Sequence, residues 1–210
     1  FYRNAVFKGS VNALGGIFSG GVPVGSGGAG GADAYEGMPL TSGTVYHVGS
    51  THTNADDNND GKSKDRPLKT INKAISKTTA NKGDIILVNP GHLDTVTVAA
   101  GILLDKAGIS IIGMGQGEDR PEVNFTTATT ATLRITSANC TIRNLLFTNG
   151  IDSQAMMIDV RAKDFEISGC DFREGASSQN LIAVNVGNAA NDSDRAVIAG
   201  NKFYCPTAGP

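Results

Sequence analysis

The chain has 210 residues, a formal net charge of −2 and a sequence pI near 5.9. This charge gives no electrostatic reason to expect nucleic acid or an anionic membrane as a partner. No apolar run approaches the roughly 20 residues that a membrane-spanning helix needs, so we expect no membrane partner either. A chain of this length can bury one sizeable core and carry an additional segment.

Residues 1–43 have the composition of an extended, glycine-rich arm. The stretch from Gly20 to Gly31 is almost entirely glycine, serine, valine and alanine. Glycine at this density is costly to order, which is typical of a linker or of an arm that lies on another surface. Two interpretations stay open: a disordered or cloning-derived segment, and an arm that binds an assembly partner. The second is favoured by the apolar residues Phe1, Tyr2, Val6, Phe7, Leu14, Ile17 and Phe18.

Residues 44–83 begin with a predicted strand, Val45–Val48, followed by a polar loop. In that loop Asp56, Asn58, Asp60 and Gly61 match the first half of a calcium-binding loop. Proline occupies position 67, where such a loop needs its closing carboxylate, so we exclude an EF-hand. Calcium binding by Asp56, Asn58 and Asp60 stays open, but a loop held by Asx-turns is the favoured interpretation.

The segment Pro67–Ala80 is predicted to be a helix. One face carries apolar or small residues at helical spacing, namely Leu68, Ile71, Ala74, Ile75 and Thr78. A proline near the start suits the first helical turn. The open end of a solenoid core needs a cover, and this helix directly precedes the first predicted strand of residues 84–210. We therefore expect it to cap the core.

The chain from about residue 138 onward repeats one pattern three times. Each copy has an isoleucine, then asparagine or glycine two positions later, then phenylalanine three positions further on. The copies are Ile142–Asn144–Phe147, Ile167–Gly169–Phe172 and Ile198–Gly200–Phe203, with steps of 25 and 31 residues. A second apolar pair (133/135, 158/160 and 184/186) recurs at 25 and 26 residues. The extra length of the last step therefore lies near residues 188–194, which are polar and turn-like.

These repeats predict a parallel β-helix for residues 84–210. Short runs of β-formers with period 2 indicate strands too weak to stand alone. Asn144, Gly169 and Gly200 fall where a sharp corner needs positive φ. Equivalent residues of successive coils should then stack in ladders spaced ~4.8 Å apart. A β-sandwich with similar strand spacing is the alternative.

Five sequence segments occur in a familiar order. They are the strand-like segment 45–48, the Asp/Asn-Gly loop, and the segments 66–74, 83–91 and 109–115. Together they resemble the start of right-handed parallel β-helix proteins of the pectin-lyase-like superfamily, over roughly residues 44–205. The resemblance implies an all-β fold, a right-handed parallel β-helix solenoid with an N-terminal capping helix. It implies little about function, because this fold carries lyases, hydrolases, adhesins and virion proteins. The added glycine-rich arm resembles, in architecture only, phage tail spikes and capsid decorations.

The predicted outward positions carry opposite charges on neighbouring coils rather than stacked carboxylates. The expected pairs are Arg143–Glu166, Asp171–Lys202 and Arg134–Asp159. Exposed pairs of this kind contribute only about 0–1 kcal/mol each and are typical of a structural surface.

Few other residues suggest chemistry. Asp152, Asp164 and Glu174 lie in turns and are the place to search for an acid pair of a glycan-cleaving enzyme. His47, His52 and His92 are scattered and are predicted to lie at the surface or at strand edges. Cys140 and Cys170 fall at inward positions on different strands, so we expect no disulfide.

The sequence thus predicts a non-enzymatic virion structural protein, a capsid decoration or spike subunit, with no catalytic residue and no required cofactor. Its arm would bind other virion or assembly proteins, and the chain could also form a homo-oligomer. Two alternatives stay open: a polysaccharide-binding or polysaccharide-degrading β-helix, and a bacterial surface adhesin, which would place the protein outside the cell or at its surface. The final predicted strand has no capping helix after it, so its edge needs a continuing chain, blocking prolines or another subunit.

Overall fold

The computed structural model describes residues 41–175, 177–187 and 193–206, together with the backbone of 11–12, 16–19 and 22–23. The chain divides into two compact units, Phe1–Leu40 and Thr41–Pro210. In the first unit, β1 (Val11–Asn12), β2 (Gly16–Ser19) and β3 (Val22–Pro23) form an antiparallel sheet. Part of the segment predicted as an extended arm therefore forms strands. The side chains predicted to bind a partner, from Phe1 to Phe18, lie outside the described residues.

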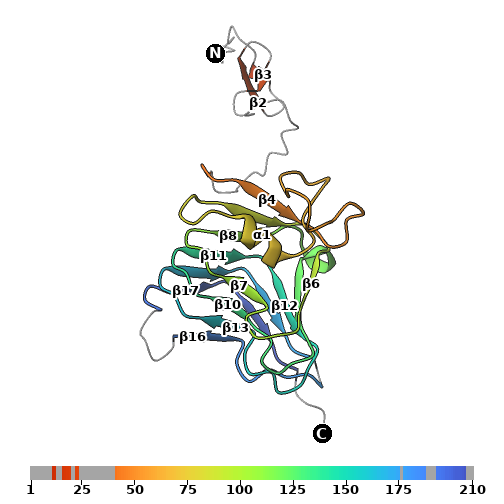
Figure 1. The fold of residues 1–210 in the computed structure, drawn as a ribbon, viewed down its shortest axis with the longest axis vertical. Helices are drawn as coiled ribbons and strands as arrows, with labels where there is room; N and C mark the ends of the chain where they lie inside the picture. The colour runs from red at the N-terminus through yellow and green to blue at the C-terminus, as the bar shows by residue number, and fades with distance from the viewer. Residues whose placement is uncertain are drawn as a thin grey trace, which may run out of the picture. The chain divides into compact units, whose positions relative to one another are not determined.

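The second unit is built mainly from three parallel sheets, which the chain visits in turn (Figure 1). The six-stranded sheet contains β4 (Val45–Val48), β5 (Ile85–Val88), β8 (Ser110–Gly113), β11 (Cys140–Arg143), β14 (Phe165–Ser168) and β17 (Val197–Ala199). The five-stranded sheet contains β6 (Leu93–Val96), β9 (Glu122–Phe125), β12 (Leu146–Asn149), β15 (Asp171–Arg173) and β18 (Lys202–Tyr204). The four-stranded sheet contains β7 (Ile102–Leu104), β10 (Leu133–Ile135), β13 (Ile158–Val160) and β16 (Val184–Val186).

One strand from each sheet makes one coil, and successive coils stack in parallel register. Ile142 pairs with Ile167, which pairs with Ile198. Phe147, Phe172 and Phe203 align in the same way. The steps of 25 and 31 residues predicted from the sequence are thus confirmed, and the longer connection lies between β16 and β17. The fold is all-β, parallel and solenoid-like.

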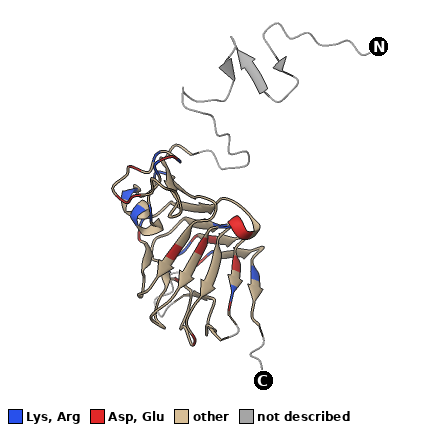
Figure 2. Cartoon of the chain, turned by 90° about the vertical axis from the view of Figure 1, so that its right-hand side faces the viewer, with Lys and Arg blue, Asp and Glu red and all other residues tan. Residues whose placement is uncertain are grey.

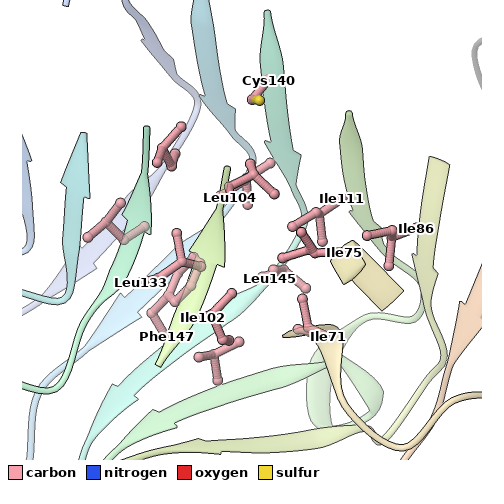
Figure 3. Packing of buried hydrophobic residues seen from close by; sticks show 14 of the residues in the cluster. Ile71, Ile75, Ile86, Ile102, Leu104, Ile111, Leu133, Cys140, Leu145 and Phe147 are labelled. Atoms are coloured by element: carbon pink, nitrogen blue, oxygen red, sulfur yellow. The ribbon is translucent and has the colours of Figure 1, made fainter. Parts of the chain in front are cut away.

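The core lies between the three sheets and is filled by the inward ladders. Leu104, Ile111, Leu133 and Leu145 are fully buried there and belong to the same hydrophobic cluster as Phe147 (Figure 3). The phenylalanine ladder is stacked, with ring centroids 6.4 Å apart for Phe125–Phe147, 5.0 Å for Phe147–Phe172 and 4.9 Å for Phe172–Phe203. Burying such a side chain contributes about 1.5–3 kcal/mol relative to leaving it exposed.

The predicted corners have the expected backbone. Asn144, Gly169 and Gly200 have φ of 54°, 62° and 64°. The Asn144 side chain also fastens its coil to the preceding one, because its Nδ2 donates to the carbonyl oxygens of Gly113 and Gly115, both at 2.9 Å. Glycine is required at 113 because a Cβ there would lie 2.1 Å from the backbone oxygen of Asn144.

The helix α1 (Ile71–Lys77) is shorter than the predicted segment Pro67–Ala80. The prediction was wrong at the start because the Asp57 carboxylate accepts hydrogen bonds from the backbone N–H groups of Lys69 and Thr70, at 2.8 and 3.0 Å. Thr70 then serves as the N-cap, its side chain accepting from the N–H of Lys73. Within the described residues, no helix is long and apolar enough to cross a membrane.

Helix α1 packs against β4, β5 and β7 at the first coil, as predicted for a cap (Figure 1). Ile71, Ala74 and Ile75 are its buried residues. Side chains also join the helix to the strand edges it faces. The N–H of Ile71 donates to Asp94 at 2.8 Å, and Asn72 accepts from the N–H of Leu103 at 3.2 Å.

The opposite end of the stack is open among the described residues. β16, β17 and β18 are the last strands of their sheets. Ile198 is 44% exposed and Phe203 is 54% exposed, whereas Ile167 and Phe172, one coil earlier, are buried. The apolar ladders therefore continue to the end of the described stack without a covering layer.

The phenylalanine ladder gives a direct test of this difference. Replacing buried Phe147 by alanine should lower the free energy of unfolding by roughly 3–5 kcal/mol. The same change at Phe203 should cost less than about 1 kcal/mol because more than half of that side chain is already in water. Urea unfolding of both variants measures the two costs. Equal costs would contradict an open final coil.

Candidate functional site

A candidate binding site borders the outer face of β15 and β18. A hollow of about 540 Å³ is lined by Asp171, Arg173, Lys202, Phe203 and Tyr204, which we call the β18 hollow. Parallel pairing places Asp171 beside Lys202 and Arg173 beside Tyr204. Because residues i and i+2 of a strand point to the same face, two cations and a phenol ring share this surface.

The Asp171 carboxylate is held by arginines rather than by Lys202. Arg173 donates to Asp171 Oδ2 through Nη2 at 2.7 Å and through Nε at 3.1 Å, and Arg120 Nη1 lies 3.9 Å away. The hydrogen bond with Asp171 raises the pKa of Arg173 above its ordinary value. The predicted register of Asp171 and Lys202 is right, but no salt bridge joins them among the described residues. Arg173, two positions along the same strand, binds the Asp171 carboxylate in place of Lys202, because its planar guanidinium group can donate two hydrogen bonds at once.

Asp159 is the most deeply buried of the outward-facing carboxylates. Its side chain is 1% exposed beneath Arg134 and Arg161, whose nitrogens lie 2.9 Å from Oδ2. Asn185 donates to the other oxygen at 3.2 Å. The predicted Arg134–Asp159 pair is thus confirmed, but the aspartate is not a solvated surface group. Burial alone would raise the pKa of Asp159, but the hydrogen bonds from Arg161, Asn185 and Arg134 outweigh it and lower that pKa.

The third predicted pair, Arg143–Glu166, is formed at 3.0 Å on a more exposed part of the surface. The hydrogen bond from Arg143 lowers the pKa of Glu166, helped by one from Ser168. Both acidic and basic residues occur along the strands of the second unit (Figure 2). Arg120, Arg161 and Arg173 were missed as partners. The Asp-x-Arg spacing at 159/161 and 171/173 would have revealed two of them.

The three turn carboxylates proposed as an acid cluster do not all meet. Asp152 accepts from the N–H of Gln179, and Glu174 accepts from the N–H of Asn180, both at 3.3 Å. These two carboxylates therefore bind adjacent peptide groups of one loop. Asp164 lies at a different corner, between β13 and β14, and pairs with Arg195 at 2.6 Å. That hydrogen bond lowers the pKa of Asp164.

The loop predicted as a calcium site is held by Asx-turns. Asp56 Oδ1 accepts from the N–H and the side-chain amide of Asn58, at 2.8 and 2.9 Å, and Asp60 Oδ1 accepts from the N–H of Lys62 at 3.1 Å. A polar hollow of about 430 Å³ beside it is lined by Asp56, Arg66 and neighbouring residues of the loop. The described residues contain no cluster of three or more His, Cys, Asp or Glu side chains able to hold a metal ion. Calcium binding at Asp56, Asn58 and Asp60 remains a prediction.

Two histidines predicted at the surface or strand edges are buried. His47 is 7% exposed and His92 is 1% exposed. His92 Nδ1 accepts from the N–H of Ser50 at 3.0 Å, and its Nε2 lies 3.6 Å from Asp94. Asp94 accepts from the N–H of Ile71 and so joins the first turn of α1 to β6, whereas His92 Nε2 has no hydrogen-bond partner among the described residues. A structural role fits this position.

The inward cysteines are free thiols, as predicted. Cys140 and Cys170 are buried on neighbouring coils. Burial raises the pKa of both thiols, to about 11 for Cys170. They are therefore protonated core residues rather than nucleophiles at neutral pH.

Comparison with known proteins adds no assignment: no family model matches the chain, and neither a curated protein nor a solved structure was found to be similar to it. The site must therefore be interpreted from its own geometry.

The two outer carboxylates Asp159 and Glu166 should respond differently to neutralisation. Asp159→Asn removes a buried charge that two arginines and Asn185 bind, so it should cost roughly 1.5–3 kcal/mol of unfolding free energy at pH 7. Glu166→Gln, on the more exposed pair, should cost about 0–1 kcal/mol. Urea unfolding at fixed pH compares them.

The pH dependence of the unfolding free energy tests the direction of the Asp159 pKa shift. The pKa of Asp159 in the fold is below its unfolded value near 3.9. Its carboxylate therefore stabilises the protein above about pH 4, and that contribution is lost as the pH falls through the folded pKa. The difference between wild type and Asp159→Asn should shrink as the pH is lowered from 5 to 2. A difference that does not change over this range would contradict the assignment.

Proposed function

We propose that this chain forms a right-handed parallel β-helix of the pectin-lyase-like type. We further propose that it serves as a non-enzymatic structural subunit of a virion, a capsid decoration or a spike. The three parallel sheets and the capped first coil support the fold. The division into two compact units supports separate anchoring and projecting parts. The first 43 residues would contact other virion proteins.

The observation that carries this proposal is that arginines bind the outer carboxylates and keep them ionised. Arginines bind Asp159, Asp164 and Glu166, and the net effect at each is a lowered pKa. These three carboxylates are therefore unsuited to the general-acid role of a glycan-cleaving enzyme, because a general acid must keep a proton near neutral pH. Ionised carboxylates in arginine pairs instead give each coil a fixed link to its neighbour.

A polysaccharide-degrading enzyme is the second candidate function, and one observation favours it. Asp152 and Glu174 lie on the same loop corner, bound to consecutive peptide groups. Two carboxyl groups about 5–9 Å apart are the machinery of glycoside hydrolysis. Asp164 lies at another corner and therefore offers a matched control.

The enzyme alternative is tested with acidic and neutral polysaccharides as substrates. We expect no turnover by the wild-type chain, measured as released reducing ends or unsaturated sugar. Turnover that the double variant Asp152→Asn, Glu174→Gln abolishes and Asp164→Asn retains would overturn the structural proposal.

The anchoring role is tested by limited proteolysis with mass spectrometry, on the isolated chain and on a native particle that contains it. We expect cleavage within residues 1–43 of the isolated chain and protection of the same peptides in the particle, because a docked arm is inaccessible to protease. The strands from 85 to 173 act as the internal control and should resist cleavage in both samples. Equal protection of residues 1–43 in both samples would reject anchoring.

A further inference from the structure

His92, directly before β6, is a buried histidine whose two ring nitrogens have different surroundings. Its Nδ1 accepts a hydrogen bond from the N–H of Ser50 at 3.0 Å. Because an accepting ring nitrogen carries no proton, the neutral imidazole has its proton on Nε2. That N–H donor is buried and has no hydrogen-bond partner among the described residues. The site therefore suits the neutral ring but leaves one donor unsatisfied.

The Asp94 carboxylate lies beside this unsatisfied donor. Its Oδ2 is 3.6 Å from His92 Nε2, which is too long for a hydrogen bond. The same oxygen accepts from the N–H of Ile71 at 2.8 Å. Ile71 is the first residue of α1, so this oxygen joins the cap to β6. A small shift of Asp94 toward the ring would form one hydrogen bond and lengthen the other.

The partner of Nδ1 belongs to a second junction with the cap. Ser50 Oγ accepts from the N–H of Leu93 at 3.0 Å and donates to its carbonyl oxygen at 2.9 Å. The N–H of the preceding residue, Gly49, donates to the carbonyl oxygen of Leu68 at 2.9 Å, just before α1. Residues 49–50 thus connect the start of β6 to the approach of the helix, and the hydrogen bond to His92 is part of this connection.

A proton added to His92 acts on both junctions. It must go to Nδ1, because Nε2 already carries one, and Nδ1–H would then face the N–H of Ser50. That hydrogen bond is lost, and the ring becomes a buried cation, which is costly unless it is paired. Asp94 is the one described carboxylate close enough to pair with it. Pairing draws Oδ2 away from the N–H of Ile71.

The other ionisable groups of the segments around His92 are bound elsewhere or lie nearer the surface. Asp57 binds backbone N–H groups just before α1, and Glu122 of β9 accepts from Thr148. His52 lies two residues after Ser50, is only partly buried, and accepts a backbone N–H of its own loop. The remaining charged side chains of these segments are Lys69, Lys73, Asp119 and Arg120.

We propose that His92 is a pH-sensitive switch for the cap of the first coil. The neutral ring keeps the Ser50 and Ile71 hydrogen bonds intact. As the pH falls from 8 to 5, the range in which histidine side chains gain their charge, the ring exchanges both for a pair with Asp94. Residues 49–50 and the first turn of α1 then open more often over the apolar first coil. This inference does not depend on the proposed virion function.

The test is NMR-detected hydrogen exchange of the full chain between pH 7.5 and pH 5.0. Each rate is corrected for the intrinsic pH dependence of amide exchange. The protection of the Ser50 and Ile71 amides should fall about fivefold or more, because each loses its acceptor. The amides of β11, which lie between two neighbouring strands, serve as the internal control and should keep their protection.

Three variants identify the groups involved. His92→Asn retains an acceptor for the Ser50 N–H but cannot gain a proton, so the protection of both amides should become independent of pH. Asp94→Asn retains an oxygen for Ile71 but removes the charge, so Ser50 should still respond and Ile71 should not. His52→Asn is the matched control and should respond as the wild type does. Because this control and Asp94→Asn leave His92 in place, the test does not depend on the folding of His92→Asn.

Constant protection of Ser50 and Ile71 in the wild type would overturn the proposal. A fall in protection that His92→Asn retains would also overturn it, because another group would then be titrating. Loss of the response in His52→Asn would assign the switch to that histidine instead. A response at Ser50 without one at Ile71 would reject the connection to the cap.

Discussion

The structure depends on the stacking of like residues at equivalent positions of successive coils. The strands described in the second unit have at most four residues each, and such strands are unstable alone. They are stable here because each Ile, Leu or Phe packs against its counterpart one coil away and because backbone hydrogen bonds join the coils. The stability of a repeat stack is close to the sum of the interaction energies between neighbouring repeats. The coils at its two ends have only one such neighbour each.

The two ends of this stack differ. Helix α1, its N-cap Thr70 and Asp94 cover the first coil with both apolar side chains and hydrogen-bonding groups. At the last coil, the same ladder positions that are buried elsewhere are half exposed. Among the described residues, the stack is therefore covered at its first coil and exposed at its last.

The ladders could be predicted from the sequence because a repeat fixes register: once Ile142 and Ile167 are equivalent, so are Phe147 and Phe172. The positive-φ corners followed from the same alignment. The start of α1 could not be predicted, because Asp57, thirteen residues before Thr70, takes the peptide groups of the expected first turn. Periodicity also gave no indication that His47 and His92 are buried, since burial of a polar residue depends on which segment packs over it.

The outer face was only partly predictable for a similar reason. The opposite-charge neighbours across coils followed from register, and Arg143–Glu166 and Arg134–Asp159 are formed. Asp171 binds Arg173 of its own strand because a two-position spacing brings both side chains to one face at short distance. The burial of Asp159 depends on two arginines that arrive from different positions, Arg134 and Arg161. Pairwise alignment of repeats does not reveal such three-body arrangements.

Hydrogen–deuterium exchange of the isolated chain, followed strand by strand, tests the account most directly. We expect the slowest exchange in β8, β11 and β14, where each strand has a neighbour on both sides, and comparably slow exchange in β5 beneath the cap. Exchange should be fastest in β17 and β18, whose outer edges are free among the described residues. Equal protection of β18 and β12 in the isolated chain would contradict an open final coil.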